Sequence, residues 1–166
     1  MITGHPPILE SRTLAWPDEA ACEATARAVA AHLLAPDAYI ELHGTLGAGK
    51  TTFTRHLLHA LGVTGRVKSP TYTVVEPYES AERPGLAIFH FDFYRFDDPQ
   101  EWEDAGFRDI FAAPGLKIAE WPEKAAGLLP LADLQVFIEI ADDDTHQDAR
   151  RVRLLAATER GRGLLP

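Results

Sequence analysis

One short stretch of this sequence combines glycines, a lysine and a hydroxyl residue at the spacing that binds phosphate. Residues 44–51 are Gly-Thr-Leu-Gly-Ala-Gly-Lys-Thr, which fits the pattern G-x-x-x-x-G-K-S/T. The glycines permit a tight turn whose backbone N–H groups point inward at an anion. The Lys50 ammonium would then face the β- and γ-phosphates of a nucleotide, and the Thr51 hydroxyl suits a Mg²⁺ ligand. The sequence therefore predicts a nucleotide-binding phosphate loop.

The segments on either side of the loop are the ones that such a loop requires. Residues 39–42 have the composition of a buried strand, and Phe53, Leu57 and Leu61 recur every four residues, which indicates one face of a helix. The N-terminus of that helix would direct its positive dipole end at the phosphates. The alternative, a glycine-rich turn before an ordinary helix, is disfavoured because the strand and the helix are both present.

A phosphate loop also needs a carboxylate to hold Mg²⁺, and two residues compete for that role. Asp92 ends the apolar strand expected at 86–91, and Glu120 ends the one expected at 116–119. Because the carboxyl ends of parallel strands meet beside the ligand, either residue can reach the site. A carboxylate buried there without a cation would be costly, so we expect each to meet Mg²⁺, Lys50 or an arginine. Which of the two orders the attacking water stays open at this point.

The order of the predicted strands and helices indicates an α/β protein. We expect a single-domain, P-loop NTPase-like three-layer sandwich whose mixed sheet is mostly parallel, with antiparallel edge strands. Those edges would come from the strand pair within 72–93 and from the C-terminal pair of strands expected at 134–140 and 151–156. A length of 166 residues suits one domain, so residues 1–166 are taken as one unit. Residues 1–7 and 159–166 are expected to be loose termini.

Two helix starts can be predicted from proline and capping residues. Pro17 is placed at the first position of a helix whose buried stripe includes Cys22 and Val29. Asp98 is expected to cap a second, short helix with Pro99 at its first position. Cys22 is the single cysteine, which excludes an internal disulfide framework and favours a core role.

Composition and charge exclude several classes of protein. The net charge of −9 argues against a main surface that binds nucleic-acid phosphate, but an acidic protein could dock onto a basic partner. No apolar run approaches 18 residues and no signal segment is present, so we expect a cytoplasmic protein without membrane contact. His56 and His59 lack a third metal ligand nearby and are assigned to a solvated face. The acidic residues 142–144 are assigned to a solvated turn, because their spacing does not fit a calcium loop.

Four blocks of the sequence together resemble the TsaE family, the bacterial ATPases of tRNA threonylcarbamoyladenosine biosynthesis. The blocks are the phosphate loop, Ser-Pro-Thr-Tyr at 69–72, His-Phe-Asp-Phe-Tyr-Arg at 90–95 and Glu-Trp-Pro at 120–122. The last two blocks are the specific part, because many NTPases share the phosphate loop. The four blocks span residues 44–122, and the chain ends add little to the resemblance.

The resemblance implies an ATPase that binds ATP and Mg²⁺, hydrolyses ATP slowly and acts on a partner complex of TsaB and TsaD. That complex attaches threonylcarbamoyl to adenosine 37 of tRNA, so tRNA would be met only indirectly. Carried onto this sequence, the phosphate-binding residues are Gly47, Ala48, Gly49, Lys50, Thr51 and Thr52; Asp92 and Glu120 are the Mg²⁺ and water-ordering carboxylates; Ser69–Thr71 is a switch-type loop; and Trp121 lies near the nucleotide.

Two other functions fit a phosphate loop. A small-molecule kinase would need an arginine-rich lid. In residues 97–109 the only basic residue is Arg108, and the other charged residues are acidic. A nucleotide-gated adaptor would bind without hydrolysis, and replacing Glu120 with Gln would separate the two cases. A GTPase is disfavoured because no N-K-x-D motif is present. Arg95 is the candidate within the chain for an arginine at the γ-phosphate.

Overall fold

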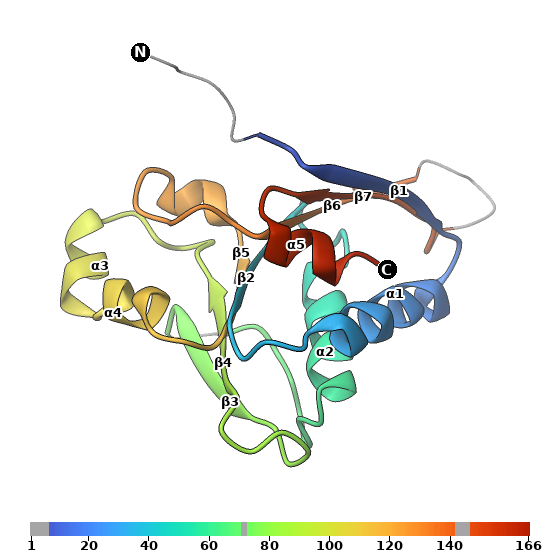
Figure 1. The fold of residues 1–166 in the computed structure, drawn as a ribbon. Coiled ribbons are helices and arrows are strands. Elements are labelled where there is room, and N and C mark those ends of the chain that lie inside the picture. The colour runs from blue at the N-terminus through green and yellow to red at the C-terminus, as the bar shows by residue number, and fades with distance from the viewer. Residues whose placement is uncertain (1–6, 71–72, 142–146) are drawn as a thin grey trace.

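The computed structural model describes residues 7–70, 73–141 and 147–166, which form an α/β fold around one twisted sheet (Figure 1). The strands of the sheet are β1 (Glu10–Trp16), β2 (Ala38–His43), β3 (Val75–Glu79), β4 (Ala87–Asp92), β5 (Leu116–Glu120), β6 (Leu134–Ile140) and β7 (Arg150–Ala156). The helices are α1 (Glu19–His32), α2 (Lys50–Ala60), α3 (Pro99–Asp104), α4 (Phe107–Ala112), α5 (Glu159–Leu164) and the 3₁₀ turn η1 (Pro122–Ala125). None of these helices is long and apolar enough to cross a membrane.

The strand order is β1-β7-β6-β2-β5-β4-β3. The four central strands, β6, β2, β5 and β4, run parallel to one another. The pairs β3–β4, β6–β7 and β7–β1 are antiparallel. This confirms the predicted mixed sheet with a parallel centre and antiparallel edges. Pro77 lies on β3, an edge strand, as expected for a residue that cannot donate a ladder hydrogen bond.

Helices cover both faces of the sheet, which confirms the three-layer arrangement (Figure 1). On one face, α1 and α2 enclose an aliphatic core with Ile40 and Leu42 of β2. On the other face, α3 and α4 enclose a largely aromatic core that includes Tyr39 of β2 and Phe91 of β4. Neighbouring residues of β2 therefore contribute to opposite cores, as the alternation of side chains along a strand requires.

Of the two helix starts predicted from the sequence, one is confirmed and one is wrong. Asp98 caps α3 by accepting a hydrogen bond from the Gln100 amide at 2.9 Å, with Pro99 in the first turn, as predicted. For α1 the predicted start at Pro17 is wrong, since the helix begins at Glu19. Asp18 adopts extended backbone and its carboxylate accepts from the Ala21 amide at 3.0 Å. The capping residue thus fixes the boundary, and the proline lies just outside it.

The C-terminal residues are not loose, contrary to the expectation for 159–166. They form α5, which Thr158 caps, and Leu164 and Leu165 are 2% and 5% exposed. The His32 ring nitrogen Nδ1 lies 2.8 Å from the Leu165 carbonyl oxygen, which joins the tail to α1. The segment contains two glycines and therefore has a low helix propensity, so packing decides its structure. Of the other expected loose terminus, 1–7, residues 1–6 lie outside the described residues, as do residues 142–144.

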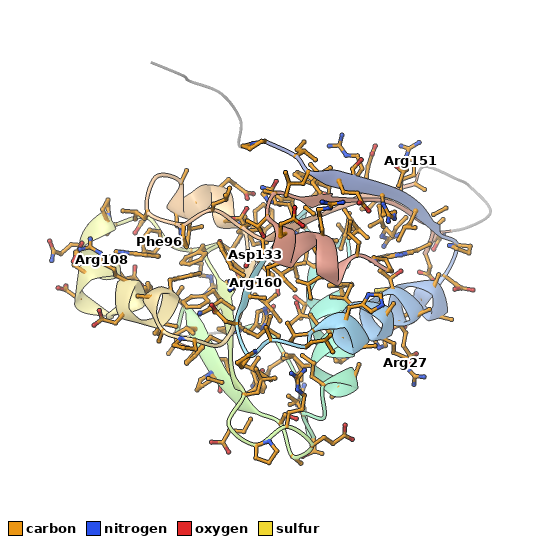
Figure 2. The ribbon with its side chains drawn as sticks, viewed as in Figure 1. Arg27, Phe96, Arg108, Asp133, Arg151 and Arg160 are labelled. Carbon is orange, nitrogen blue, oxygen red and sulfur yellow. The ribbon has the colours of Figure 1, made fainter. Side chains whose placement is uncertain are left out.

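Asp133 fastens α5 to the sheet. Its carboxylate accepts from the backbone amide of Tyr39 at 2.8 Å and from the hydroxyl of Thr158 at 2.7 Å. Arg160 adds a longer ionic contact at 3.9 Å. Figure 2 shows Asp133 and Arg160 near the middle of the molecule, whereas Arg108 lies at its edge. Polar contacts and apolar burial therefore hold the same helix in place.

Two glycines of α5 provide a test of this packing. A Cβ added at Gly161 would lie 1.8 Å from the Asp133 carbonyl oxygen, whereas one at Gly163 would meet nothing within 4 Å. We expect Gly161→Ala to lower the free energy of unfolding by about 1–3 kcal/mol through overpacking. Gly163→Ala should leave it unchanged or raise it by up to about 1 kcal/mol, because alanine favours helix. Urea unfolding curves measure both, and equal midpoints for the two variants would contradict the described position of α5.

Candidate functional site

The predicted phosphate loop joins the end of β2 to the start of α2. Gly47 and Gly49 have φ values of 81° and 114°, in the left-handed region that favours glycine. This turn places the first residue of α2, Lys50, beside the carboxyl end of the parallel strands. The 11-residue helix leaves its first amides without helical partners, so they could bind an anion.

The Lys50 side chain folds back into the loop. Its ammonium donates to the carbonyl oxygens of Gly44 at 2.5 Å and Thr45 at 3.0 Å, and it lies 4.1 Å from the centre of the Trp121 ring. Lys50 is 4% exposed, and no carboxylate of the described residues is within ion-pair distance. Burial lowers the Lys50 pKa, and the more distant charge of Glu120 opposes that shift. The loop therefore contains a buried cation whose neighbours are carbonyl oxygens and an aromatic ring.

Thr51 and Glu120 are in direct contact. The Thr51 hydroxyl lies 2.9 and 3.0 Å from the two oxygens of the Glu120 carboxylate, which is buried at the end of β5. The Ser69 hydroxyl is 2.8 Å from the same Thr51 oxygen, so the start of the predicted switch-type loop reaches the site. Thr71, which ends that predicted loop, lies outside the described residues. His90 of β4 contacts Glu120 from the other side, with 2.5 Å between Nε2 and Oε2.

Asp92 lies beside this cluster, because it is the register partner of Glu120 across β4 and β5. It is half-buried, and its carboxylate accepts from the Tyr94 amide at 2.9 Å. Burial raises the Asp92 pKa, with the negative charge of Glu120 acting in the same direction. Asp92 also lines a pocket of about 430 Å³ together with Ser69 and the exposed Arg95. Arg95 thus lies at this pocket, and the structure gives it no contact with the loop residues described above.

Trp121 has the one positive φ value, 57°, among the described residues other than glycine. A left-handed conformation is costly for a bulky residue and is found where the surroundings impose it. Here it follows Glu120 directly and turns the indole ring over the Lys50 ammonium. The ring also packs against Tyr94, with 5.0 Å between ring centres. The structure therefore places Trp121 at the predicted site.

The site could hold a divalent cation only with help from a ligand. Among the described residues no group of three or more His, Cys, Asp or Glu could hold a metal ion. Mg²⁺ at a nucleotide needs fewer protein ligands, because phosphate oxygens and water complete its octahedron. The adjoining oxygens of Thr51 and Glu120, with Asp92 nearby, fit that requirement. His56 and His59 instead bond the Glu19 carboxylate and the Gly65 carbonyl, each at 3.0 Å, and lie apart from this site.

Sequence reasoning missed Arg150, which contacts the loop from β7. Its Nε donates to the Ala48 carbonyl at 2.7 Å. With Trp16, Cys22 and Thr52 it also lines a pocket of about 130 Å³ beside the loop. Arg150 is far from the loop in sequence and follows no local motif. The register of β7 brings it to the loop, and only a known strand order could have revealed that.

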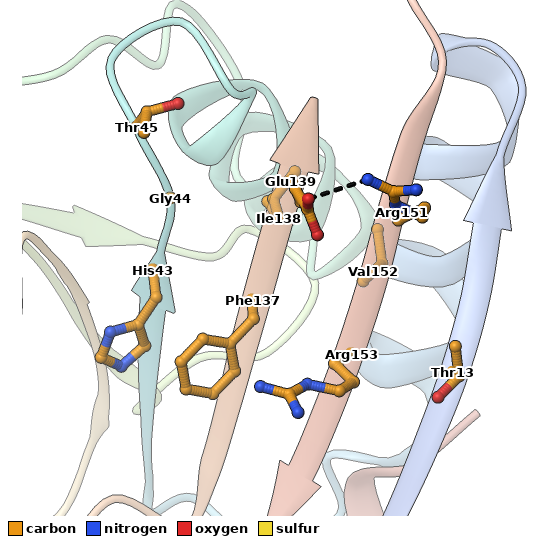
Figure 3. Close-up of a pocket in the computed structure, with 10 residues that line it drawn as sticks. All are labelled: Thr13, His43, Gly44, Thr45, Phe137, Ile138, Glu139, Arg151, Val152 and Arg153. Carbon is orange, nitrogen blue, oxygen red and sulfur yellow. Dashed lines mark hydrogen bonds and ion pairs between the residues drawn. The ribbon is translucent and has the colours of Figure 1, made fainter. Parts of the chain in front are cut away.

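A larger pocket, of about 410 Å³, lies on the other face of the sheet and begins at Gly44 (Figure 3). Its Phe137 ring lies between the His43 ring, 4.4 Å away, and the Arg153 guanidinium, 5.2 Å away. These three residues are register neighbours on β2, β6 and β7. The charged residues of this pocket, Glu139, Arg151 and Arg153, are exposed, so it differs from the surroundings of the buried Lys50.

Comparisons with known proteins agree on one family. The family model described as "Threonylcarbamoyl adenosine biosynthesis protein TsaE" matches residues 16–152. The chain is similar to the tRNA threonylcarbamoyladenosine biosynthesis protein TsaE of Haemophilus influenzae, with 47% identity over 76% of this chain and 75% of the relative. The TsaE protein of Bacillus subtilis is 38% identical over 68% of each chain. The crystal structure of Bacillus subtilis YdiB superposes with a TM-score of 0.72 at 28% identity, covering 93% of this chain and 91% of that one.

The single cysteine, Cys22, provides a test of how closed the pocket of about 130 Å³ beside the loop is. Cys22 is 4% exposed, and burial raises its pKa to about 12 from 9.0. A raised pKa removes thiolate, which is the reactive form, so modification at pH 8 should be about 1000-fold slower than for a free thiol. Ellman's reagent measures the rate, and the protein unfolded in guanidinium is the control. A native rate equal to the unfolded rate would show that the pocket is open to solvent.

Proposed function

The chain belongs to the TsaE family of tRNA threonylcarbamoyladenosine biosynthesis proteins, and on that basis we propose that it is a Mg²⁺-dependent ATPase. In this proposal it binds ATP, hydrolyses it slowly and acts on a TsaB–TsaD complex, which carries out the tRNA modification. The buried Lys50 ammonium is the observation that carries the proposal. It lies between loop carbonyls and an aromatic ring, at a helix N-terminus, where a phosphate chain would supply the missing negative charge.

In this proposal, different groups of the loop bind different parts of Mg-ATP. Backbone amides from Gly47 to Thr52 would bind the phosphates, and Lys50 would neutralise the charge that spreads over the transferring phosphoryl group. The Thr51 hydroxyl and the Glu120 carboxylate would hold Mg²⁺, which supplies further neutralisation of the β- and γ-oxygens when bound. The pocket beside Thr52, Trp16 and Arg150 is next to the loop and is the place proposed for the base.

The positions of the two carboxylates favour different roles. Glu120 contacts Thr51 directly, so it is assigned to the metal. Asp92 lines the open pocket next to Ser69, where a water molecule has access, so it is assigned to ordering the attacking water. Slow turnover follows from the positions of the arginines, since Arg95 is exposed and Arg150 is engaged with the Ala48 carbonyl. A partner that completes the site would raise the rate.

One observation favours a second function, phosphoryl transfer to a small molecule. The pocket of about 430 Å³ next to Asp92 could admit a phosphoryl acceptor. A screen of small hydroxylated and phosphorylated acceptors, with radiolabelled γ-phosphate, distinguishes this function. Labelled acceptor would support a kinase, and free phosphate alone supports the ATPase.

Conservative changes at the two carboxylates should separate metal binding from water ordering. Asp92→Asn should keep the affinity for Mg-ATP and lower kcat about 100-fold, because it removes a base that orients water. Glu120→Gln should raise the Mg²⁺ concentration for half-maximal turnover about tenfold or more, because it removes a charged ligand. Single-turnover hydrolysis at several Mg²⁺ concentrations measures both effects. Wild-type turnover in both variants would contradict the assigned roles.

The partner proposal has a test of its own. Purified TsaB–TsaD should be retained on immobilised protein in the presence of ATP and should raise steady-state turnover several-fold. Fast turnover of the isolated protein that is indifferent to TsaB–TsaD would overturn this part of the proposal and leave nucleotide binding in place.

A further inference from the structure

His90 is a buried polar residue that the proposed chemistry has not yet used. It is 0% exposed and lies on β4, next to the carboxyl end of β5. Its Nε2 is 2.5 Å from the Glu120 carboxylate. An ionised carboxylate only accepts hydrogen bonds, so Nε2 carries a proton and donates it. The other ring nitrogen, Nδ1, has no hydrogen-bond partner among the described residues.

This arrangement is unfavourable for a residue that serves only the core. Buried polar atoms are paired in most proteins, and an unpaired one lowers stability. An apolar side chain at this position would avoid the unpaired Nδ1, since Ile88 and Phe91 show that β4 otherwise buries apolar groups. The one side-chain hydrogen bond of His90, to the Glu120 carboxylate, is therefore the contact that an apolar residue could not make.

The contacts of Glu120 explain why such support matters. Its two oxygens share one hydroxyl donor, Thr51, at nearly equal distances of 2.9 and 3.0 Å, so this contact alone does little to fix the rotation of the carboxylate. His90 is then the donor that fixes the rotation of the carboxylate. Outer partners of this kind orient metal ligands and raise their basicity.

We propose that His90 is a positioning residue that orients Glu120 toward the divalent cation of the nucleotide site. The proposal rests on the proposed function, because it requires a cation at Thr51 and Glu120. His90 itself would touch neither the nucleotide nor the metal. Its loss should therefore weaken cation binding and leave metal-free nucleotide binding unchanged.

The experiment compares wild type with His90→Leu, using ADP and Mn²⁺ as probes. Free Mn²⁺ is followed by electron paramagnetic resonance in the presence of saturating ADP, and ADP affinity is measured separately in EDTA. For His90→Leu we expect the Mn²⁺ affinity of the ADP complex to fall about 10- to 100-fold. The ADP affinity in EDTA should stay within about twofold, because it depends on the loop.

Two further variants keep the test valid if the leucine variant is poorly folded. The amide nitrogen of Gln can reach nearly the position of Nε2, so His90→Gln should restore most of the Mn²⁺ affinity. The shorter amide of His90→Asn falls short of Glu120 and should not restore it. In a Glu120→Gln background, His90→Leu should cause no further loss, because the two residues act as one unit.

The outcomes distinguish this inference from the proposed function. Unchanged Mn²⁺ affinity in His90→Leu would overturn the role of His90 and leave the ATPase proposal standing. Equal losses in the Gln and Asn variants, accompanied by weaker ADP binding in EDTA, would indicate a role in folding and would also overturn it. If ADP recruits no Mn²⁺ to the wild-type protein, the proposed metal site and the role of His90 both fail.

Discussion

The arrangement of this protein depends on keeping one positive charge out of water. The Lys50 ammonium is almost fully buried and is compensated by two carbonyl oxygens and the face of Trp121, none of which carries a full negative charge. Such partners compensate a cation only in part, because desolvation of a charge is expensive. The lowered pKa of Lys50 expresses the same cost. An anion bound at the loop, as proposed above, would compensate the Lys50 charge more fully than these partners do.

The sheet provides the rigid support for this site. The buried Glu120 and the half-buried Asp92 lie on the adjacent parallel strands β5 and β4, in register with one another. The Thr51 hydroxyl joins the first turn of α2 to β5, and the left-handed backbone of Trp121 places its ring over the loop. These contacts come from three separate segments of the chain. Precision at the site thus comes from the parallel pairing of β2, β5 and β4.

Much of this could be predicted from local patterns. The phosphate loop, the apolar runs that became β2, β4 and β5, and the carboxylates at their ends all follow from residue types within a few positions of one another. The contribution of Arg150 and the single hydrogen bond of His90 could not be predicted, since both depend on which strands become neighbours. The helical C-terminus was missed because its glycines indicate no helix, and it is stabilised by the burial of Leu164 and by the contact of Thr158 with Asp133. Long-range packing decided each of these cases.

The position of β1 has a consequence for how the chain is made. This strand pairs only with β7, which is the last strand in the sequence. A ribosome delivers β1 before β2 to β6, so β1 has no partner until β7 emerges. Until then β1 and β6 both present unpaired edges, which are the surfaces that drive unwanted association between chains. A product truncated before β7 would keep those edges exposed, so the protection of both edges depends on the single strand Arg150–Ala156.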